Sequence, residues 1–232
     1  MTRRSAPNRS KSPLATRHEI GYTAVLNTQA PIPFSTERLD AYLDAAGIDV
    51  LVVNSKHNIQ YLLGGHRHPF FDINDAIGVS RYLPLLIYHK GKPDRTLYTA
   101  SRNEKDALSN RRDKAGLWVP QVEVKSSGTL DAMALAVAHL RSVGADGSRI
   151  GIEAGFLPLD AGTALRNGLP AATLVEALRP LERLRAVKSR DEHDLLRTAS
   201  DLVVESMLSV IAQHGPGTVK RDLFEALRRE ET

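Results

Sequence analysis

The stretch ERLDAYLDAAGIDVLVVNSKHNIQYLLGG, residues 37–65, decides the fold. In its first part, apolar residues recur at helical spacing, and Ser35 and Gly47 are suited to begin and end a helix. IDVLVV, residues 48–53, is a short apolar run rich in β-branched residues, which is typical of a strand buried on both faces. NIQYLL, residues 58–63, predicts a second, short helix. A helix, a buried strand and a helix in succession indicate an α/β fold.

The same alternation continues outward along the chain. YLPLLIYH (82–89) and RTLYTA (95–100), joined by a GKP turn, predict a hairpin. LWVPQVEVK (117–125) predicts a strand, and Pro120 favours an edge position for it. Further strands are expected at 149–154 and 172–177, and helices at 101–110, 129–144 and 158–168. Together these elements predict a three-layer fold, a mixed sheet with helices on both faces.

Composition excludes several classes of protein. The chain has 232 residues, of which 42% are hydrophobic and 25% charged, so it is not a wholly disordered protein. It has no cysteine, which excludes disulfides, thiolate catalysis and iron–sulfur clusters. No run approaches the roughly 18 apolar residues of a membrane span, and the first 20 residues lack the apolar core of a secretory signal. We therefore expect a cytoplasmic protein with no membrane partner.

The net charge of +4 comes from the beginning of the chain. The first 20 residues carry five basic side chains against Glu19 alone, which equals the whole excess. Residues 1–30 are also rich in Ser, Pro and Arg without periodicity, so we expect a disordered basic leader there, and contact with an anionic surface stays open as its role. The remaining residues balance in charge, and no nucleic-acid partner is expected.

The character of the sequence changes at residue 189. Ser189 and Glu192 form an S-x-x-E capping box, followed by a long amphipathic helix to about Gln213. HGPG (214–217) breaks this helix, and a further helix follows. The 43 residues from Arg190 onward are fewer than the roughly 50 residues of a self-sufficient domain. We expect a leader at 1–30, an α/β domain at 31–188, and at 189–232 a truncated second domain whose apolar faces need a partner surface.

Few residues carry recognisable chemistry. His66 and His68 could bind a metal with Asp72 and Asp75, or lie in a solvated loop. Arg67 beside Phe70 and Phe71 could hold a carboxylate on an aromatic floor. No G-x-S-x-G, P-loop or G-x-G-x-x-G motif occurs. The residues alone therefore predict no catalytic set.

Glu153 ends a predicted strand, a position where catalytic acids are often found. The alternative is a structural carboxylate that caps a helix or forms a salt bridge, and this second role is favoured.

Four stretches resemble the creatinase–prolidase family of pita-bread metallopeptidases: residues 37–65, RIGIEAGFLPLDAGTAL (149–165), LERLRAVKSRDEHDLLRTAS (181–200) and GPGTVKRDLFEAL (215–227). The first carries the N-I-x-Y-L-x-G turn of the family. In the third, an L-R-x-x-K-S strand would lead into the first helix of the catalytic domain. The resemblance implies a ribonuclease H-like N-terminal domain over 31–188, followed by the first two helices of an incomplete pita-bread domain.

The resemblance also implies a function. Most members are Xaa-Pro aminopeptidases or dipeptidases that use two divalent metals, such as manganese, cobalt or zinc, held by two Asp, one His and two Glu downstream of the helices seen here. No catalytic residue or metal ligand is therefore expected in this chain, which alone would be inactive. Its role would be to form a homodimer and to cover the partner's active site. The substrates would be proline-containing peptides, and the substrate-binding residues would be His66, Arg67, His68 and Phe70. A free-standing dimerisation or binding module, or a fragment of a creatinase-like amidinohydrolase without metals, are the alternatives.

Overall fold

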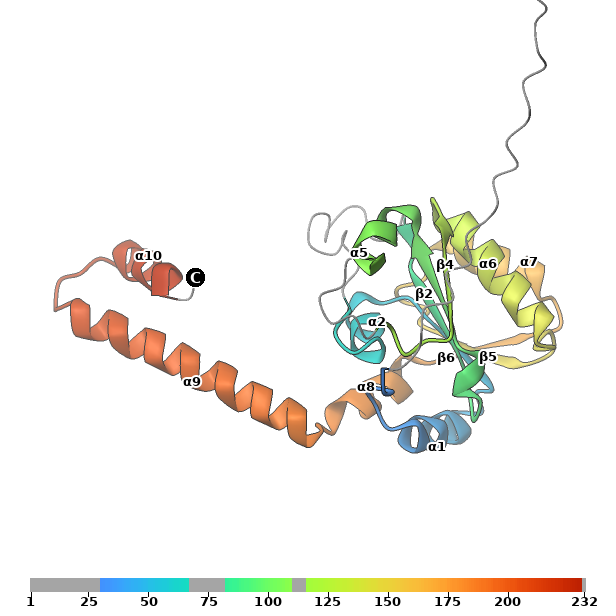
Figure 1. The fold of residues 1–232 in the computed structure, drawn as a ribbon, viewed down its shortest axis with the longest axis horizontal. Helices are drawn as coiled ribbons and strands as arrows, with labels where there is room; N and C mark the ends of the chain where they lie inside the picture. The colour runs from blue at the N-terminus through green and yellow to red at the C-terminus, as the bar shows by residue number, and fades with distance from the viewer. Residues whose placement is uncertain (1–29, 67–81, 110–115, 231–232) are drawn as a thin grey trace, which may run out of the picture.

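The computed structural model describes residues 30–66, 82–109 and 116–230 (Figure 1). Its centre is a six-stranded sheet in the order β4-β3-β2-β1-β5-β6. The strands are β1 (Val50–Val53), β2 (Leu85–His89), β3 (Leu97–Ser101), β4 (Gln121–Ser126), β5 (Arg149–Ile152) and β6 (Thr173–Glu176).

The sheet is mixed, as the sequence predicts. β2 pairs antiparallel with both β1 and β3, which confirms the predicted hairpin. The β3–β4, β1–β5 and β5–β6 pairs are parallel. Every strand of this sheet except β2 therefore runs in one direction, and their carboxyl ends share one edge, here called the carboxyl edge.

Helices cover both faces of the sheet (Figure 1). The helices α1 (Thr36–Ala46), α2 (Lys56–Leu62) and α8 (Leu178–Ala186) pack on one face, and α6 (Thr129–Ser142) and α7 (Leu159–Gly168) on the other. In β1, Leu51 and Val53 join the first core, whereas Val50 and Val52 join the second. All four side chains are buried, because the central strand has a helical layer on each side. The three-layer α/β prediction is confirmed.

Local signals place the first helix as predicted. The Ser35 hydroxyl accepts a hydrogen bond from the Arg38 N–H at 3.1 Å and so caps α1. Gly47 ends the helix in the left-handed region, at φ 64°, which residues with a Cβ rarely adopt.

Prolines move two strand boundaries. β2 begins at Leu85, after Pro84, and β4 begins at Gln121, after Pro120, although both strands were predicted to begin earlier. Proline cannot donate a hydrogen bond to a neighbouring strand, so pairing starts beyond it. β4 is an edge strand, as Pro120 indicates. The helix predicted over 101–110 consists of a 3₁₀ turn, η2 (Arg102–Glu104), and α5 (Lys105–Ser109); another 3₁₀ turn, η1 (Pro93–Arg95), lies between β2 and β3.

The strand expected at L-R-x-x-K-S is wrong. Leu184 and Arg185 belong to α8, and only beyond Ala186 is the backbone extended, at Val187. Pro180 lies in the first turn of α8, where backbone N–H groups make no hydrogen bond within the helix, so the N–H that proline lacks is not needed. Leu181 and Leu184 are buried against the core, so an amphipathic helix stands where a strand was expected.

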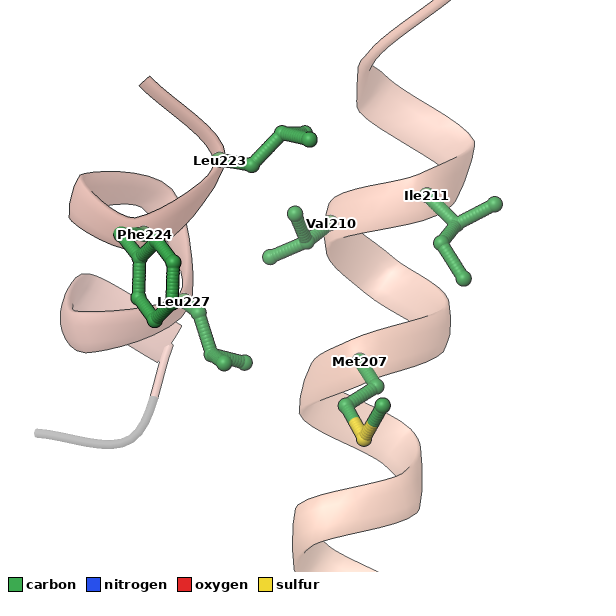
Figure 2. Close-up of a pocket in the computed structure, with 6 residues that line it drawn as sticks. All are labelled: Met207, Val210, Ile211, Leu223, Phe224 and Leu227. Atoms are coloured by element: carbon green, nitrogen blue, oxygen red, sulfur yellow. The ribbon is translucent and has the colours of Figure 1, made fainter. Parts of the chain in front are cut away.

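The last two helices are α9 (Arg190–Gln213) and α10 (Lys220–Glu230). Ser189 and Glu192 form the predicted capping box at the start of α9. α9 extends away from the sheet, and α10 packs against its far end (Figure 1). Their contact leaves an apolar pocket of about 210 Å³ (Figure 2), lined by Met207, Val210, Ile211, Leu223, Phe224 and Leu227.

α9 exposes apolar side chains on more than one side. Leu195 is 70% exposed, Leu202 59% and Ile211 66%. A helix that is apolar on several sides belongs in the interior of a larger body, because one neighbouring helix covers a single stripe.

Candidate functional site

Two buried polar clusters lie at the carboxyl edge of the sheet. The first surrounds Glu153, the residue that follows β5 and that has no solvent exposure. Its Oε2 accepts the backbone N–H groups of Asn54 at 2.7 Å and Ser55 at 2.8 Å, and its Oε1 accepts the Asn58 side-chain amide at 2.7 Å. Asn54 and Ser55 begin the turn from β1 into α2, so a carboxylate from β5 holds the start of that helix.

This arrangement makes Glu153 a helix-capping residue, the second of the two roles considered for it. Ser55, the N-cap residue of α2, makes no capping hydrogen bond with its own side chain. The Glu153 carboxylate caps the helix in another way, by accepting the N–H of the N-cap residue Ser55 and of Asn54 before it, and a carboxylate also suits the positive end of the helix dipole. Arg185 of α8 donates to the Asn58 Oδ1 at 3.1 Å. The cluster therefore ties β1, β5, α2 and α8 together.

The second cluster contains His66. Of the four predicted substrate-binding residues, His66 is the one that lies within the described residues. The His66 Nε2 lies 3.1 Å from the Oε2 of Glu104, and the Tyr98 hydroxyl donates to the same oxygen at 3.0 Å. The Ser101 N–H reaches the other carboxylate oxygen, Oε1, at 3.3 Å. Glu104 has no exposure and His66 only 8%. Burial, followed by the negative charge of Glu104, raises the pKa of Tyr98, so its phenol keeps its proton and acts as the donor.

The chain that leads to His66 is also anchored. The Trp118 indole Nε1 donates to the Leu62 carbonyl at 2.6 Å, at the end of α2. Gly64 and Gly65 both have positive φ, and together they turn the chain toward His66. The other predicted substrate-binding residues and carboxylates, Arg67, His68, Phe70, Asp72 and Asp75, lie outside the described residues.

Apart from these two clusters, a pair of buried histidines lies between β2 and α6. The Nε2 atoms of His89 and His139 are 3.1 Å apart, and the ring centroids 5.3 Å, so the rings meet nearly head to head. Burial is the main cause that lowers both pKa values, and His89 falls to about 4 with further contributions from His139, Arg95 and Lys92. Both rings are therefore neutral near pH 7, with one donating to the other.

The described residues do not fit a two-metal centre. Nowhere in residues 30–66, 82–109 and 116–230 do three or more His, Cys, Asp or Glu side chains gather in a way that could hold a metal ion. The pocket between α9 and α10 is lined by six apolar residues and offers no polar group to orient a small ligand (Figure 2). Among the helices of the described ranges, none combines the length and apolar character needed to span a bilayer.

Sequence reasoning missed Glu104 and Tyr98. Ser101 and Glu104 form an S-x-x-E capping box, a pattern that is visible in the sequence and predicts a local cap. Its link to His66 spans 38 residues and could not be read from local spacing.

The chain forms an α/β domain, a mixed sheet with helices on both faces and buried polar clusters at its carboxyl edge. In open α/β sheets, ligands often bind at this edge. The family is shown by sequence: the model of the Creatinase/Prolidase N-terminal domain matches residues 36–187. The chain belongs to the creatinase/prolidase family. No curated protein matches it.

Solved structures show the same fold. An Xaa-Pro dipeptidase from Bacillus anthracis is 16% identical with a TM-score of 0.63, and the match covers 84% of this chain and 47% of that chain. A dipeptidase from Pyrococcus horikoshii OT3 is 20% identical with a TM-score of 0.61, over 85% of this chain and 50% of that one. A proline dipeptidase structure from Streptococcus pneumoniae, with a TM-score of 0.50 and 19% identity, matches over 67% of this chain and 99% of its own. This chain thus spans about half the length of the first two.

Proposed function

We propose that residues 31–188 act as the non-catalytic N-terminal domain of an Xaa-Pro peptidase-like metallohydrolase. The observation that carries the proposal is the family match over residues 36–187. Hydrolysis would take place in a region outside the described residues, where two divalent metals (manganese, cobalt or zinc) would be held. This chain's own contribution is to binding and assembly.

The domain would form a homodimer and cover the active site of its partner. His66, Arg67, His68 and Phe70 would contact a proline-containing peptide, with the guanidinium of Arg67 pairing with a carboxylate and Phe70 offering an apolar surface. The firm anchoring of His66 by Glu104 supports this, because a binding segment needs a fixed origin on a rigid scaffold.

α9 and α10 would begin the pita-bread domain. The apolar side chains that α9 presents on several sides support this assignment, since they suit a helix in the interior of a domain. The isolated chain would then be inactive and inclined to associate through these helices.

Binding of a dipeptide to the full chain tests the proposal. We expect titration with alanyl-proline to shift amide signals near His66 in nuclear magnetic resonance spectra, and sedimentation equilibrium to show a dimer. Arg67→Ala should weaken peptide binding without changing the melting temperature. Arg166→Ala, which removes an exposed arginine from α7, is the matched control and should bind as the wild type does. A monomer with no peptide response would refute the proposal.

A further inference from the structure

We propose that Glu104 is a positioning residue that holds His66 as its Nε2–H tautomer, so that Nδ1 becomes the hydrogen-bond acceptor of this ring. The proposal concerns a residue pair whose parts are separated by 38 positions and brought together at the carboxyl edge. Only the ligand that His66 would meet depends on the function proposed above.

The donors around Glu104 indicate the direction of its hydrogen bond with His66. The Tyr98 hydroxyl and the Ser101 N–H both point protons at the carboxylate, which therefore acts as an acceptor on both oxygens. Because both oxygens of the Glu104 side chain accept hydrogen bonds from these donors, we assign the same acceptor role to Oε2 in its 3.1 Å contact with the His66 Nε2, which then carries a hydrogen. In the neutral imidazole the other nitrogen then has the lone pair.

The cost of burying Glu104 indicates that its geometry matters. Removing a carboxylate from water costs several kcal/mol, and replacing buried ionic groups by apolar ones of similar volume is often neutral or stabilising. Here the carboxylate, at the end of η2, is fully buried and joins the turn after α2, through His66, to β3, through Tyr98 and Ser101. A carboxylate that orients a histidine in this way fixes both the direction of the ring and its tautomer.

The ligand group that such a ring accepts is an N–H or O–H donor. An unblocked Xaa-Pro dipeptide has such a donor on its backbone at the amino terminus, because the proline nitrogen carries no hydrogen, so His66 would contact that end of the peptide. This last step rests on the proposed function, whereas the tautomer does not.

Nitrogen spectra of the histidine side chains in the full chain, recorded without ligand, test the proposal. The chain has eight histidines, and His66→Asn identifies the signal of His66. We expect a protonated Nε2 and an unprotonated Nδ1 in the wild type. Glu104→Leu should turn this signal into a mixture of tautomers, and Glu104→Gln, whose carbonyl can still accept, should restore part of it.

Tyr98→Phe is the control, because it removes one donor from the same carboxylate and leaves the His66 contact in place. It should leave the tautomer unchanged even if the protein becomes less stable. A wild-type His66 with its hydrogen on Nδ1 would overturn the proposal, and so would an unaltered tautomer in Glu104→Leu. If Glu104→Leu does not fold, the wild-type spectrum still decides. Because no peptide is present, failure of the proposed peptide binding leaves this result standing.

Discussion

Replacing Glu153 by Gln should destabilise the α/β domain severely. The carboxylate accepts three hydrogen bonds, two from the backbone at the start of α2 and one from the Asn58 amide. A glutamine has one oxygen, so its own NH₂ would face either the backbone N–H groups or the Asn58 Nδ2. Asn58 cannot flip to relieve the conflict, because its Oδ1 already accepts from Arg185.

The magnitude follows from these contacts. One hydrogen bond to a charged acceptor, worth about 1.5–3 kcal/mol, is lost and its buried donor is left unpaired. The other two become hydrogen bonds between neutral groups, which are about half as strong. We expect a loss of about 3–5 kcal/mol in the free energy of unfolding, a large part of the 5–15 kcal/mol that typical domains have. Urea unfolding of the full chain, followed by circular dichroism, measures it.

The matched control is Glu176→Gln. Glu176 also accepts two backbone N–H groups, from Leu178 at 2.8 Å and Ala154 at 3.2 Å, but its side chain is exposed to solvent. Water can satisfy the groups that this variant leaves, so we expect a loss below about 1 kcal/mol. If Glu153→Gln costs no more than Glu176→Gln, the reasoning about the buried cap is refuted.

Three further predictions follow from other parts of the chain. The pKa of His89 is about 4 in the folded chain and 6.5 in the unfolded chain, so as the pH falls the unfolded chain takes up this proton first. The contribution of neutral His89 to the free energy of unfolding is therefore complete above pH 6.5 and falls by about 3 kcal/mol as the pH drops to 4. Urea unfolding across this pH range should show a weaker dependence in His89→Gln, and an identical one would contradict the assignment. Gly151→Ala places a Cβ 2.9 Å from an Ile48 methyl and should cost about 1–3 kcal/mol, whereas Gly147→Ala meets nothing within 4 Å and should cost little; equal melting temperatures would count against the packing. The purified chain should not cleave Xaa-Pro dipeptides with added manganese, cobalt or zinc, because its described residues gather no metal-ligand cluster, and turnover that a chelator abolishes would show otherwise.

Elements with local signals could be predicted from the sequence. The β-branched run at 48–53, the Ser35 cap and the capping box at Ser189 each depend on residues within a few positions of one another, and the structure contains all three. α8 was missed because the L-R-x-x-K-S pattern of the family favoured a strand from Leu184, although the spacing of Leu181 and Leu184 is helical.

The polar clusters could not be predicted in the same way. Glu153 meets Asn54 across 99 residues, and Glu104 meets His66 across 38. A single carboxylate in a sequence gives no sign of which distant N–H groups it will accept, since that depends on how the strands are ordered in the sheet. The sequence located Glu153 at a strand end, and the parallel pairing of β1 with β5 supplied its partners.

The parallel pairing of β1 with β5 has a consequence for synthesis on the ribosome. β1 is synthesised well before β5. Glu153, which directly follows β5, comes 99 residues after its partner Asn54, which directly follows β1. At the usual rate of about 5–20 residues per second, one side of the central strand waits about 5–20 seconds for its neighbour. During this interval the nascent chain exposes an unpaired apolar strand and an uncapped α2, both of which can attract other chains. The carboxylate that completes the cap emerges together with the strand that closes the sheet, so both defects are repaired in one step.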